Sequence, residues 1–182
     1  MAIKTFATGE VLTASDTNTY LANSGLVYVT STTVGSGVSS VTISNCFSST
    51  YDNYRITYAG GVSSASGSGY LQLSGITTGL YYGALPFLSW PSTYGSVADS
   101  GSTSWRYVAG GNATFASMNL DLAMPFATKT KTIQAWYTRN GYSGFYTGYC
   151  DSISSATGFT LGNIDWGTMT GGTITVYGYR KA

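Results

Sequence analysis

The sequence contains no histidine, the side chain that most often acts as a general base and as a ligand for transition metals. Its 7 acidic residues are scattered singly, although two carboxylates distant in sequence can still meet in a folded glycosidase. We find no nucleophile-elbow, dinucleotide-binding or Ser-x-x-Lys motif. The sequence therefore predicts a protein that is not an enzyme and that binds no cofactor and no metal ion.

Charged residues are also scarce, at 8% of the chain, against roughly 25% in an average soluble domain. Disorder does not follow, because 43% of the residues are hydrophobic and can fill a core. No stretch approaches the roughly 18 continuous apolar residues of a spanning helix, so we predict no membrane insertion. The residues after Lys4 form no signal-like apolar region, and we expect a soluble chain made in a cytoplasm.

Basic residues are too few and too dispersed for a nucleic-acid partner, because affinity for nucleic acid depends largely on neutralising phosphates. The net charge is +1, and the basic groups that stand close together are Lys129 with Lys131 and Arg180 with Lys181. We expect these two pairs to be a solvated strand edge and a tail.

The chain has 2 cysteines, Cys46 and Cys150, which are too far apart for Cys-x-x-Cys chemistry. Both lie in segments that we predict to be strands. Two buried free thiols are expected, and a single disulfide remains open.

What the chain does have, from Leu26 onward, is a period of two in its hydrophobic residues, as in strands with one solvated face. This pattern predicts about nine strands, near residues 26–30, 41–43, 54–58, 71–73, 118–122, 130–139, 144–151, 159–164 and 174–176. Short strands with glycine-rich connections favour an all-β fold, an antiparallel β-sandwich of the jelly-roll-like kind, over residues 26–182.

Three connections carry turn or loop signals. Asn140-Gly141 between two predicted strands indicates a hairpin with a type I′ turn. Residues 60–69 (GGVSSASGSG) have the composition of a flexible loop tip. Residues 81–104 are predicted to be a long loop, and loops of that length are usually functional or disordered.

Residues 1–25 differ from the rest and form a predicted attachment segment. Thr13 and Asp16 have the spacing of a capping box, so we expect a helix over residues 14–23, ended by Gly25. Ten residues are too few for a helix that is stable alone in water. Its apolar side chains therefore need a partner surface, and we assign attachment to Phe6, Val11, Leu12, Tyr20 and Leu21.

Aromatic residues make up 15% of the chain, and five near the predicted long loop are candidates for a ligand platform. Aromatic rings cover the apolar C–H face of a sugar while neighbouring hydroxyl and amide groups bind its hydroxyls. Alternatively these rings pack against a sheet end or between copies of the chain, since Tyr and Trp are often half buried. The candidates are Tyr81, Tyr82, Trp90, Tyr94 and Trp105.

The opening segment resembles the N-terminus of many phage structural proteins, which often reads F-x-x-G-x-V-L-T-A-x-x-x-N-x-Y-L. Related segments tend to have an apolar residue at the position of Thr17. Residues 51–56 (YDNYRI) and 172–178 (GTITVYG) are similar to strands of phage β-sandwich modules. The opening pattern is formed here by Phe6, Gly9, Val11, Leu12, Thr13, Ala14, Asn18, Tyr20 and Leu21.

This resemblance implies a virion protein of a tailed phage, often a trimer, assembled in the host cytoplasm with other virion proteins. The leading hypothesis is a tail fibre or tail-tip component that attaches through residues 1–25 and contacts host surface glycans. A capsid decoration or head-fibre protein without a ligand is the second hypothesis. A free carbohydrate-binding module, or a glycan hydrolase using Asp121 or Asp151, is the third.

Overall fold

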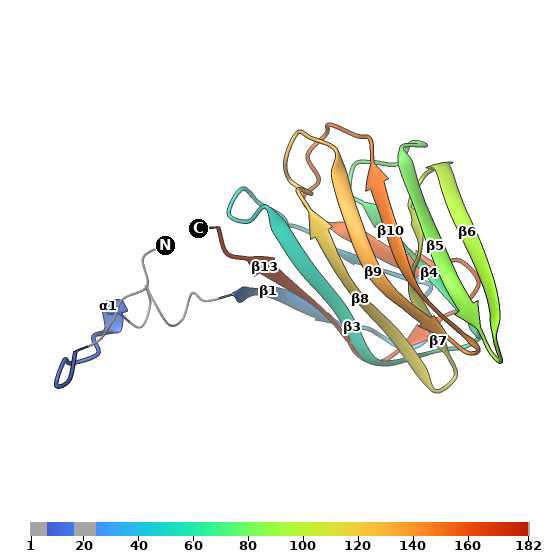
Figure 1. Ribbon diagram of the computed structural model, residues 1–182, viewed down its shortest axis with the longest axis horizontal. Helices are drawn as coiled ribbons and strands as arrows, with labels where there is room; N and C mark the ends of the chain where they lie inside the picture. Colours follow the sequence, from blue (N-terminus) through green and yellow to red (C-terminus); the bar gives the residue numbers. More distant parts are fainter. Residues whose placement is uncertain (1–6, 17–24, 182) are drawn as a thin grey trace.

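The computed structural model describes residues 7–16 and 25–181, and these are built almost entirely of antiparallel β-strands (Figure 1). Helix α1 (Ala14–Asp16) is a single short turn. The strands are β1 (Leu26–Thr33), β2 (Ser40–Ile43), β3 (Asn53–Ser63), β4 (Gly67–Leu73), β5 (Tyr81–Ser89), β6 (Thr93–Ser102), β7 (Trp105–Asn112), β8 (Phe115–Ala123), β9 (Lys131–Arg139), β10 (Tyr142–Cys150), β11 (Phe159–Asn163), β12 (Met169–Thr170) and β13 (Thr173–Tyr179).

The sheet forks at strand β8. One edge of β8 pairs with β3 along nearly its whole length. Its other edge pairs with β7 up to Met118 and with β9 from Asn119 onward. The fork gives two arms, the β7 arm (β7–β4–β11–β2) and the β9 arm (β9–β10–β5–β6), on a common stem of β1, β13, β3 and β8.

The two arms are joined across a buried core. The hydroxyls of Tyr137 on β9 and Ser68 on β4 share a hydrogen bond of 2.7 Å. The indole N–H of Trp105 on β7 donates to the carbonyl oxygen of Tyr149 on β10 at 3.1 Å. Tyr81 on β5 meets the Trp105 ring edge-on, with 5.0 Å between centroids. Because buried polar groups need partners, these bonds favour one spacing between the arms.

Strands β1, β2 and β6 each pair on one side only within the described residues, so the sheet is not closed. The predicted all-β, antiparallel class is thereby confirmed. Figure 1 shows the β9 arm in front and β4 behind it.

The period of two was a reliable guide to most strands. In β9, Ile133, Ala135 and Tyr137 are buried while the residues between them are exposed. This alternation follows from the pleat, which turns successive side chains to opposite faces. All nine predicted strands are present, at β1, β2, β3, β4, β8, β9, β10, β11 and β13.

The predicted hairpin is confirmed, but its predicted turn type is wrong. Arg139 pairs with Tyr142, which leaves Asn140 and Gly141 as the turn. A type I′ turn needs positive φ at both residues, and of the two only Gly141 has it, at 79°. The sign pattern is that of a type II turn, in which glycine takes the second central position.

The predicted flexible loop over residues 60–69 is wrong. Strand β3 continues to Ser63 and β4 begins at Gly67, so only residues 64–66 turn. The glycines here permit close packing: a Cβ on Gly69 would lie 2.7 Å from the Trp166 ring, and one on Gly67 2.4 Å from the Asp165 backbone. Composition suggests flexibility, whereas the glycines make room for buried neighbours.

The predicted long loop over residues 81–104 is also wrong. It is the hairpin of β5 and β6, and β7 follows directly from Trp105. The apolar alternation is hidden because Gly83, a strand residue, makes room for Tyr146. A Cβ on Gly83 would lie 2.1 Å from the Tyr146 hydroxyl oxygen.

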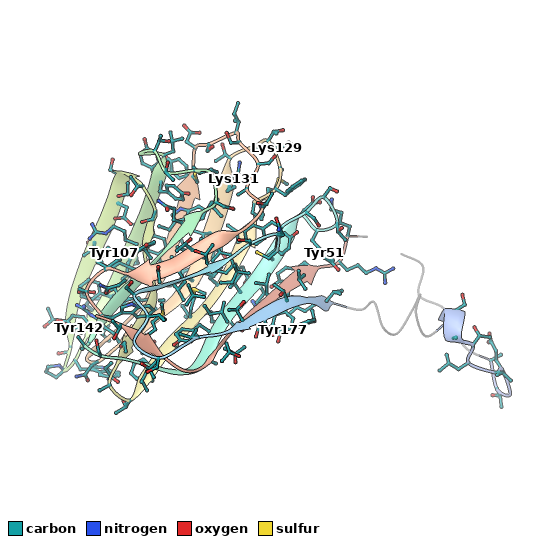
Figure 2. The ribbon with its side chains drawn as sticks, turned by 180° about the vertical axis from the view of Figure 1, so that it is seen from behind. Tyr51, Tyr107, Lys129, Lys131, Tyr142 and Tyr177 are labelled. Atoms are coloured by element: carbon teal, nitrogen blue, oxygen red, sulfur yellow. The ribbon has the colours of Figure 1, made fainter. Side chains whose placement is uncertain are left out.

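Lys131 was expected at a solvated edge, and that prediction is wrong. Its side chain is fully buried, and its ammonium group donates to the carbonyl oxygens of Ala127 (3.0 Å), Lys129 (2.7 Å) and Ser152 (2.7 Å). Lys129 is exposed at the same end of the molecule (Figure 2). The charge is tolerated inside because three acceptors replace its water shell.

Both cysteines are free and buried, as expected. Burial raises the pKa of Cys46 to about 12. In the N-terminal segment, the single turn of α1 is the described part of the helix predicted over residues 14–23. Residues 17–23 lie outside the described residues, so that helix stays a prediction. No helix of the described chain has the length and apolar character to cross a membrane.

Candidate functional site

The outer face, the side of the stem and β9 arm that is turned away from the core, carries rows of side chains fixed by strand register. Arg55 of β3 lies opposite Asp121 of β8, which lies opposite Gln134 of β9. The neighbouring row contains Asn53, Ala123 and Thr132 on the same three strands. Cross-strand neighbours of this kind are within interaction distance.

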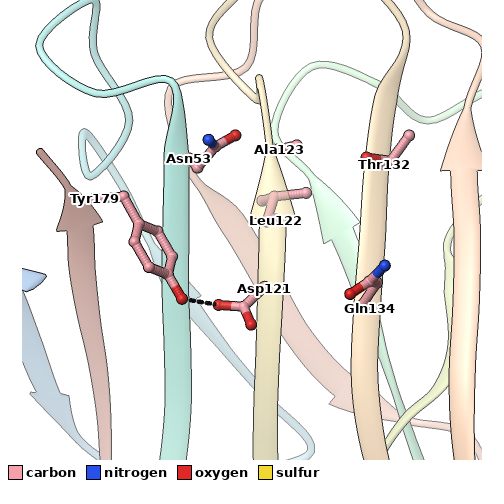
Figure 3. Close-up of a pocket in the computed structure, with 7 residues that line it drawn as sticks. All are labelled: Asn53, Asp121, Leu122, Ala123, Thr132, Gln134 and Tyr179. Atoms are coloured by element: carbon pink, nitrogen blue, oxygen red, sulfur yellow. Dashed lines mark hydrogen bonds between the residues drawn. The ribbon is translucent and has the colours of Figure 1, made fainter. Parts of the chain in front are cut away.

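Asp121 places a carboxylate on this surface, and its neighbours hold that carboxylate in position. Arg55 binds it through two hydrogen bonds, from Nε to Oδ1 at 3.0 Å and from Nη2 to Oδ2 at 2.6 Å. The hydroxyl of Tyr179 reaches across β3 and donates to Oδ1 at 2.6 Å (Figure 3). Two-point Arg–carboxylate pairs are geometrically specific, so the carboxylate is held in one orientation.

The protonation states follow from these contacts. Burial acts to raise the pKa of Asp121, but the hydrogen bonds from Arg55 and Tyr179 and the charge of Arg55 outweigh it and lower the pKa below its ordinary value. Burial and the hydrogen bond to Asp121 raise the pKa of Tyr179. Near neutral pH, Asp121 is therefore ionised, Tyr179 is protonated, and Arg55 cancels the charge.

An open groove lies over this array, with a volume of about 340 Å³. Tyr179 stands at one side, Thr132 and Gln134 stand at the other, and small Ala123 leaves the floor low (Figure 3). We call this the outer-face groove. Its lining residues are Asn53, Asp121, Leu122, Ala123, Thr132, Gln134 and Tyr179.

Aromatic side chains border the groove on its β9–β10 side. Tyr149 lies opposite Thr132 in the register of β10 and β9 and stacks on Tyr82, with 4.8 Å between ring centroids and 11° between planes. Trp136, two residues beyond Gln134 on β9, contacts Phe145 edge-on at 5.0 Å. Trp136 is 66% exposed and Tyr149 43% exposed, so much of each ring is available to a ligand.

The arrangement suits a neutral, polyhydroxylated ligand. Amide groups of Asn53 and Gln134 and the hydroxyl of Thr132 offer donors and acceptors. The bordering rings offer apolar faces for C–H groups. Among the lining residues Asp121 is the one carboxylate, and it is already occupied by Arg55.

The structure divides the five aromatic residues of the predicted platform among three places. Tyr81 and Trp105 are fully buried, so they belong to the core and present no face to a ligand. Tyr82 lies beside Tyr149 near the groove. Trp90, at the β5–β6 turn, and Tyr94, on β6, are exposed (66% and 87%), and a ligand role for them stays a prediction.

Of the predicted attachment residues, Val11 and Leu12 are exposed, and residues 7–16 lie apart from the strands (Figure 1). Phe6, Tyr20 and Leu21 lie outside the described residues. The attachment role stays a prediction.

Sequence reasoning missed most of the outer-face groove. Its residues come from four strands, β3, β8, β9 and β13, and Arg55 and Asp121 are 66 positions apart. A usable signal was present: Trp136 falls on the polar side of an alternating strand, where a large ring remains mostly exposed. Sequence reasoning named Asp121 as a candidate hydrolase residue and not as part of a groove. The missed residues are Asn53, Thr132, Gln134 and Tyr179 in the lining, and Trp136 and Tyr149 beside it.

Residues 7–16 and 25–181 contain no cluster of three or more Cys, Asp or Glu side chains able to hold a metal ion. Comparisons with known proteins do not assign this chain to a family: no family model, no curated protein and no solved structure matches it.

Proposed function

We propose that this protein is a structural component of a tailed-phage virion, at the tail fibre or tail tip, that binds host surface glycans through the outer-face groove. Residues 1–25 attach it to other virion proteins, and residues 26–182 project as the binding domain. The domain is a β-sandwich of the jelly-roll-like kind, whose two layers are the arms of the forked sheet. Copies assemble as a homotrimer. The protein inserts into no membrane and binds no nucleic acid.

The outer-face groove is the observation that carries this proposal. Amide and hydroxyl groups of Gln134 and Thr132 line a cavity of about 340 Å³. The exposed rings of Trp136 and Tyr149 are their neighbours on β9 and β10. Exposed apolar side chains rimmed by polar groups are typical of interaction sites. The mix of ring faces and neutral polar groups fits saccharides better than peptides or nucleic acid.

The groove binds without hydrolysing. Glycoside hydrolysis uses two carboxyl groups about 5–10 Å apart, and the lining supplies one, Asp121. That carboxylate is held by Arg55 and Tyr179, which keeps it ionised and unsuited to act as a general acid.

Saccharide binding by matched tryptophan variants tests the proposal. Trp136→Ala is expected to weaken binding of neutral host oligosaccharides about tenfold or more, because covering the apolar surface of a large side chain contributes roughly 1.5–3 kcal/mol. Trp90→Ala removes an equally exposed ring (66% for both) outside the groove, and it is expected to bind as the unaltered protein does. Titration calorimetry measures both.

Three outcomes are distinct. Loss in Trp136→Ala alone supports the groove. Loss in Trp90→Ala alone would move the site to the β5–β6 hairpin. No binding of any host saccharide by the unaltered protein would overturn the proposed function.

A decoration or head-fibre protein without a ligand is the second candidate, and it is favoured by strand β6. This strand lies at an edge of the sheet and carries Tyr94, 87% exposed, close to Trp90. Exposed rings on an unpaired edge suit a contact between copies. Loss of trimers in the double variant Trp90→Ala/Tyr94→Ala, with host adsorption by assembled particles unchanged, would favour this candidate.

A further inference from the structure

A second open cavity lies on the outside of the β7 arm, away from the outer-face groove. Its volume is about 600 Å³. Leu71 is buried and pairs with Trp105, so the residues that flank each of them turn outward. Six residues that line this second pocket are Tyr70, Gln72, Thr103, Ser104, Arg106 and Asn163.

Neighbouring residues hold the walls of the second pocket in place. The Tyr70 ring lies across Gly162, where a Cβ would come within 2.4 Å of the ring. The side-chain amide of Gln72 donates to the carbonyl oxygen of Thr103 at 2.9 Å. The backbone N–H of Arg106 donates to the buried carboxylate of Asp99 at 3.2 Å.

Arg106 gives the second pocket a positive charge that nothing in it cancels. No carboxylate lines the pocket, and in the described part of the chain Arg106 forms no ion pair. Three other cations are occupied: Arg55 pairs with Asp121, Arg139 with Asp165 and Lys181 with Asp52. The Arg106 guanidinium is exposed and sits 5.4 Å from the centre of the Tyr107 ring.

We propose that the second pocket binds a carboxylate-bearing sugar, such as a uronic or sialic acid residue of a host polysaccharide. The Arg106 guanidinium pairs with the sugar carboxylate, because its planar fork matches that group. The amides of Gln72 and Asn163 bind sugar hydroxyls, and Tyr70 offers a ring. This inference rests on the proposed glycan-binding function and names an acidic class of sugar at a site separate from the outer-face groove.

Paired probes test the inference: a uronic acid oligosaccharide and the same oligosaccharide after reduction of its carboxyl groups to alcohols. We expect the unaltered protein to bind the acidic probe about tenfold more tightly than the reduced one. Added salt should reduce the difference in affinity between the two probes, because the ion pair between Arg106 and the sugar carboxylate is exposed to solvent. Arg106→Gln should abolish the difference, because glutamine keeps polarity and loses the charge.

Lys129→Gln is the matched control. It removes the same charge from an exposed position outside the pocket and should keep the preference for the acidic probe. Equal binding of both probes by the unaltered protein, or an equal loss in both variants, would overturn the inference, since the effect would then be absent or due to overall charge. A sulfated oligosaccharide that binds more tightly than the uronate would also overturn it, by reassigning the pocket to sulfate.

The outcomes separate this inference from the proposed function. Equal binding of the two probes, weakened by Trp136→Ala, overturns the second pocket and leaves the groove intact. No binding of either probe or of any other host saccharide overturns both proposals. Circular dichroism of Arg106→Gln should match that of the unaltered protein, because this side chain is exposed.

Discussion

Lys131 has the most demanding environment of any single residue described here. Its fully buried ammonium group joins two stretches of chain, the loop that carries the carbonyl oxygens of Ala127 and Lys129 and the loop that carries that of Ser152. We predict that Lys131→Met lowers the free energy of unfolding by about 3 kcal/mol, because buried carbonyl groups lose their donors. Urea unfolding measures the change. Lys129→Met, at an exposed site, should cost less than about 0.5 kcal/mol, and equal costs would contradict the account.

Asp121 predicts a specific dependence of stability on pH. Its pKa in the folded protein is lowered below the ordinary 3.8. A lowered carboxyl pKa stabilises the folded state fully above the unfolded pKa, and that contribution is lost as pH falls through the folded pKa. Asp121→Asn should therefore lose less stability than the unaltered protein between about pH 5 and pH 2. Urea midpoints across this range measure the difference, and parallel curves would exclude the assigned role of Asp121.

For single residues, the sequence predicted which side chains are buried better than it predicted which groups they contact. The free, buried state of Cys46 and Cys150 was expected. The predicted strand position holds for Cys150, at the end of β10, and is wrong for Cys46, which lies in the loop after β2. The burial of Lys131 did not, because its acceptors are backbone carbonyls of loops whose course no local pattern specifies. The Arg55–Asp121 pair was equally hidden, since register between distant strands brings its members together.

At the scale of elements, the main feature is strand β8, whose partner along one edge changes from β7 to β9. Where β7 and β9 part, Gly110 of β7 approaches the Thr138 carbonyl oxygen of β9, and a Cβ on Gly110 would lie 2.2 Å from it. We predict that Gly110→Ala destabilises the protein by about 2 kcal/mol or more, because backbone must shift to admit the methyl group. Thermal and urea unfolding measure the effect.

Gly35→Ala is the matched control for that substitution. A Cβ there meets one side-chain atom of Val38 at 3.4 Å, and Gly35 has no positive φ. Its effect should be neutral or slightly stabilising, because alanine restricts the unfolded chain. A loss of stability as large as that of Gly110→Ala would show that close approach at the fork is not the cause.

Among the elements, hydrophobic alternation predicted nine strands but not the β5–β6 hairpin or β7. In β5, Gly83 stands among the buried positions because the Tyr146 hydroxyl fills the space. In β7, Gly110 and Gly111 interrupt the pattern for similar reasons. Glycines that make room for a neighbour resemble loop glycines in sequence, and only the fold distinguishes them.

At the scale of the whole molecule, we predict that the forked sheet folds without the N-terminal segment. Strand β1 begins at Leu26, and the Gly25 carbonyl oxygen accepts a hydrogen bond from Arg180 N at 3.2 Å. Deletion of residues 1–24 leaves this contact in place, so we predict an unchanged thermal midpoint. The shortened protein should fail to join virus particles, because the exposed Val11 and Leu12 are lost with the segment. Normal incorporation would contradict the attachment role.

The all-β fold class could be predicted because the composition and the alternation of hydrophobic residues both favour strands. The arrangement of the two arms could not be predicted, because it depends on the residue at which β8 changes its partner from β7 to β9. The outer-face groove lies on the stem and β9 arm, and the second pocket lies on the β7 arm. Their surfaces are assembled from residues distant in sequence.

A reconstruction of the whole virus particle tests the central claim most directly, because it locates every copy of the chain. The account predicts the protein at the tail fibre or tail tip, with residues 1–25 against other virion proteins and the outer-face groove open to the surroundings. Copies in the head shell, with Trp136 and Tyr179 covered by a neighbouring protein, would contradict it.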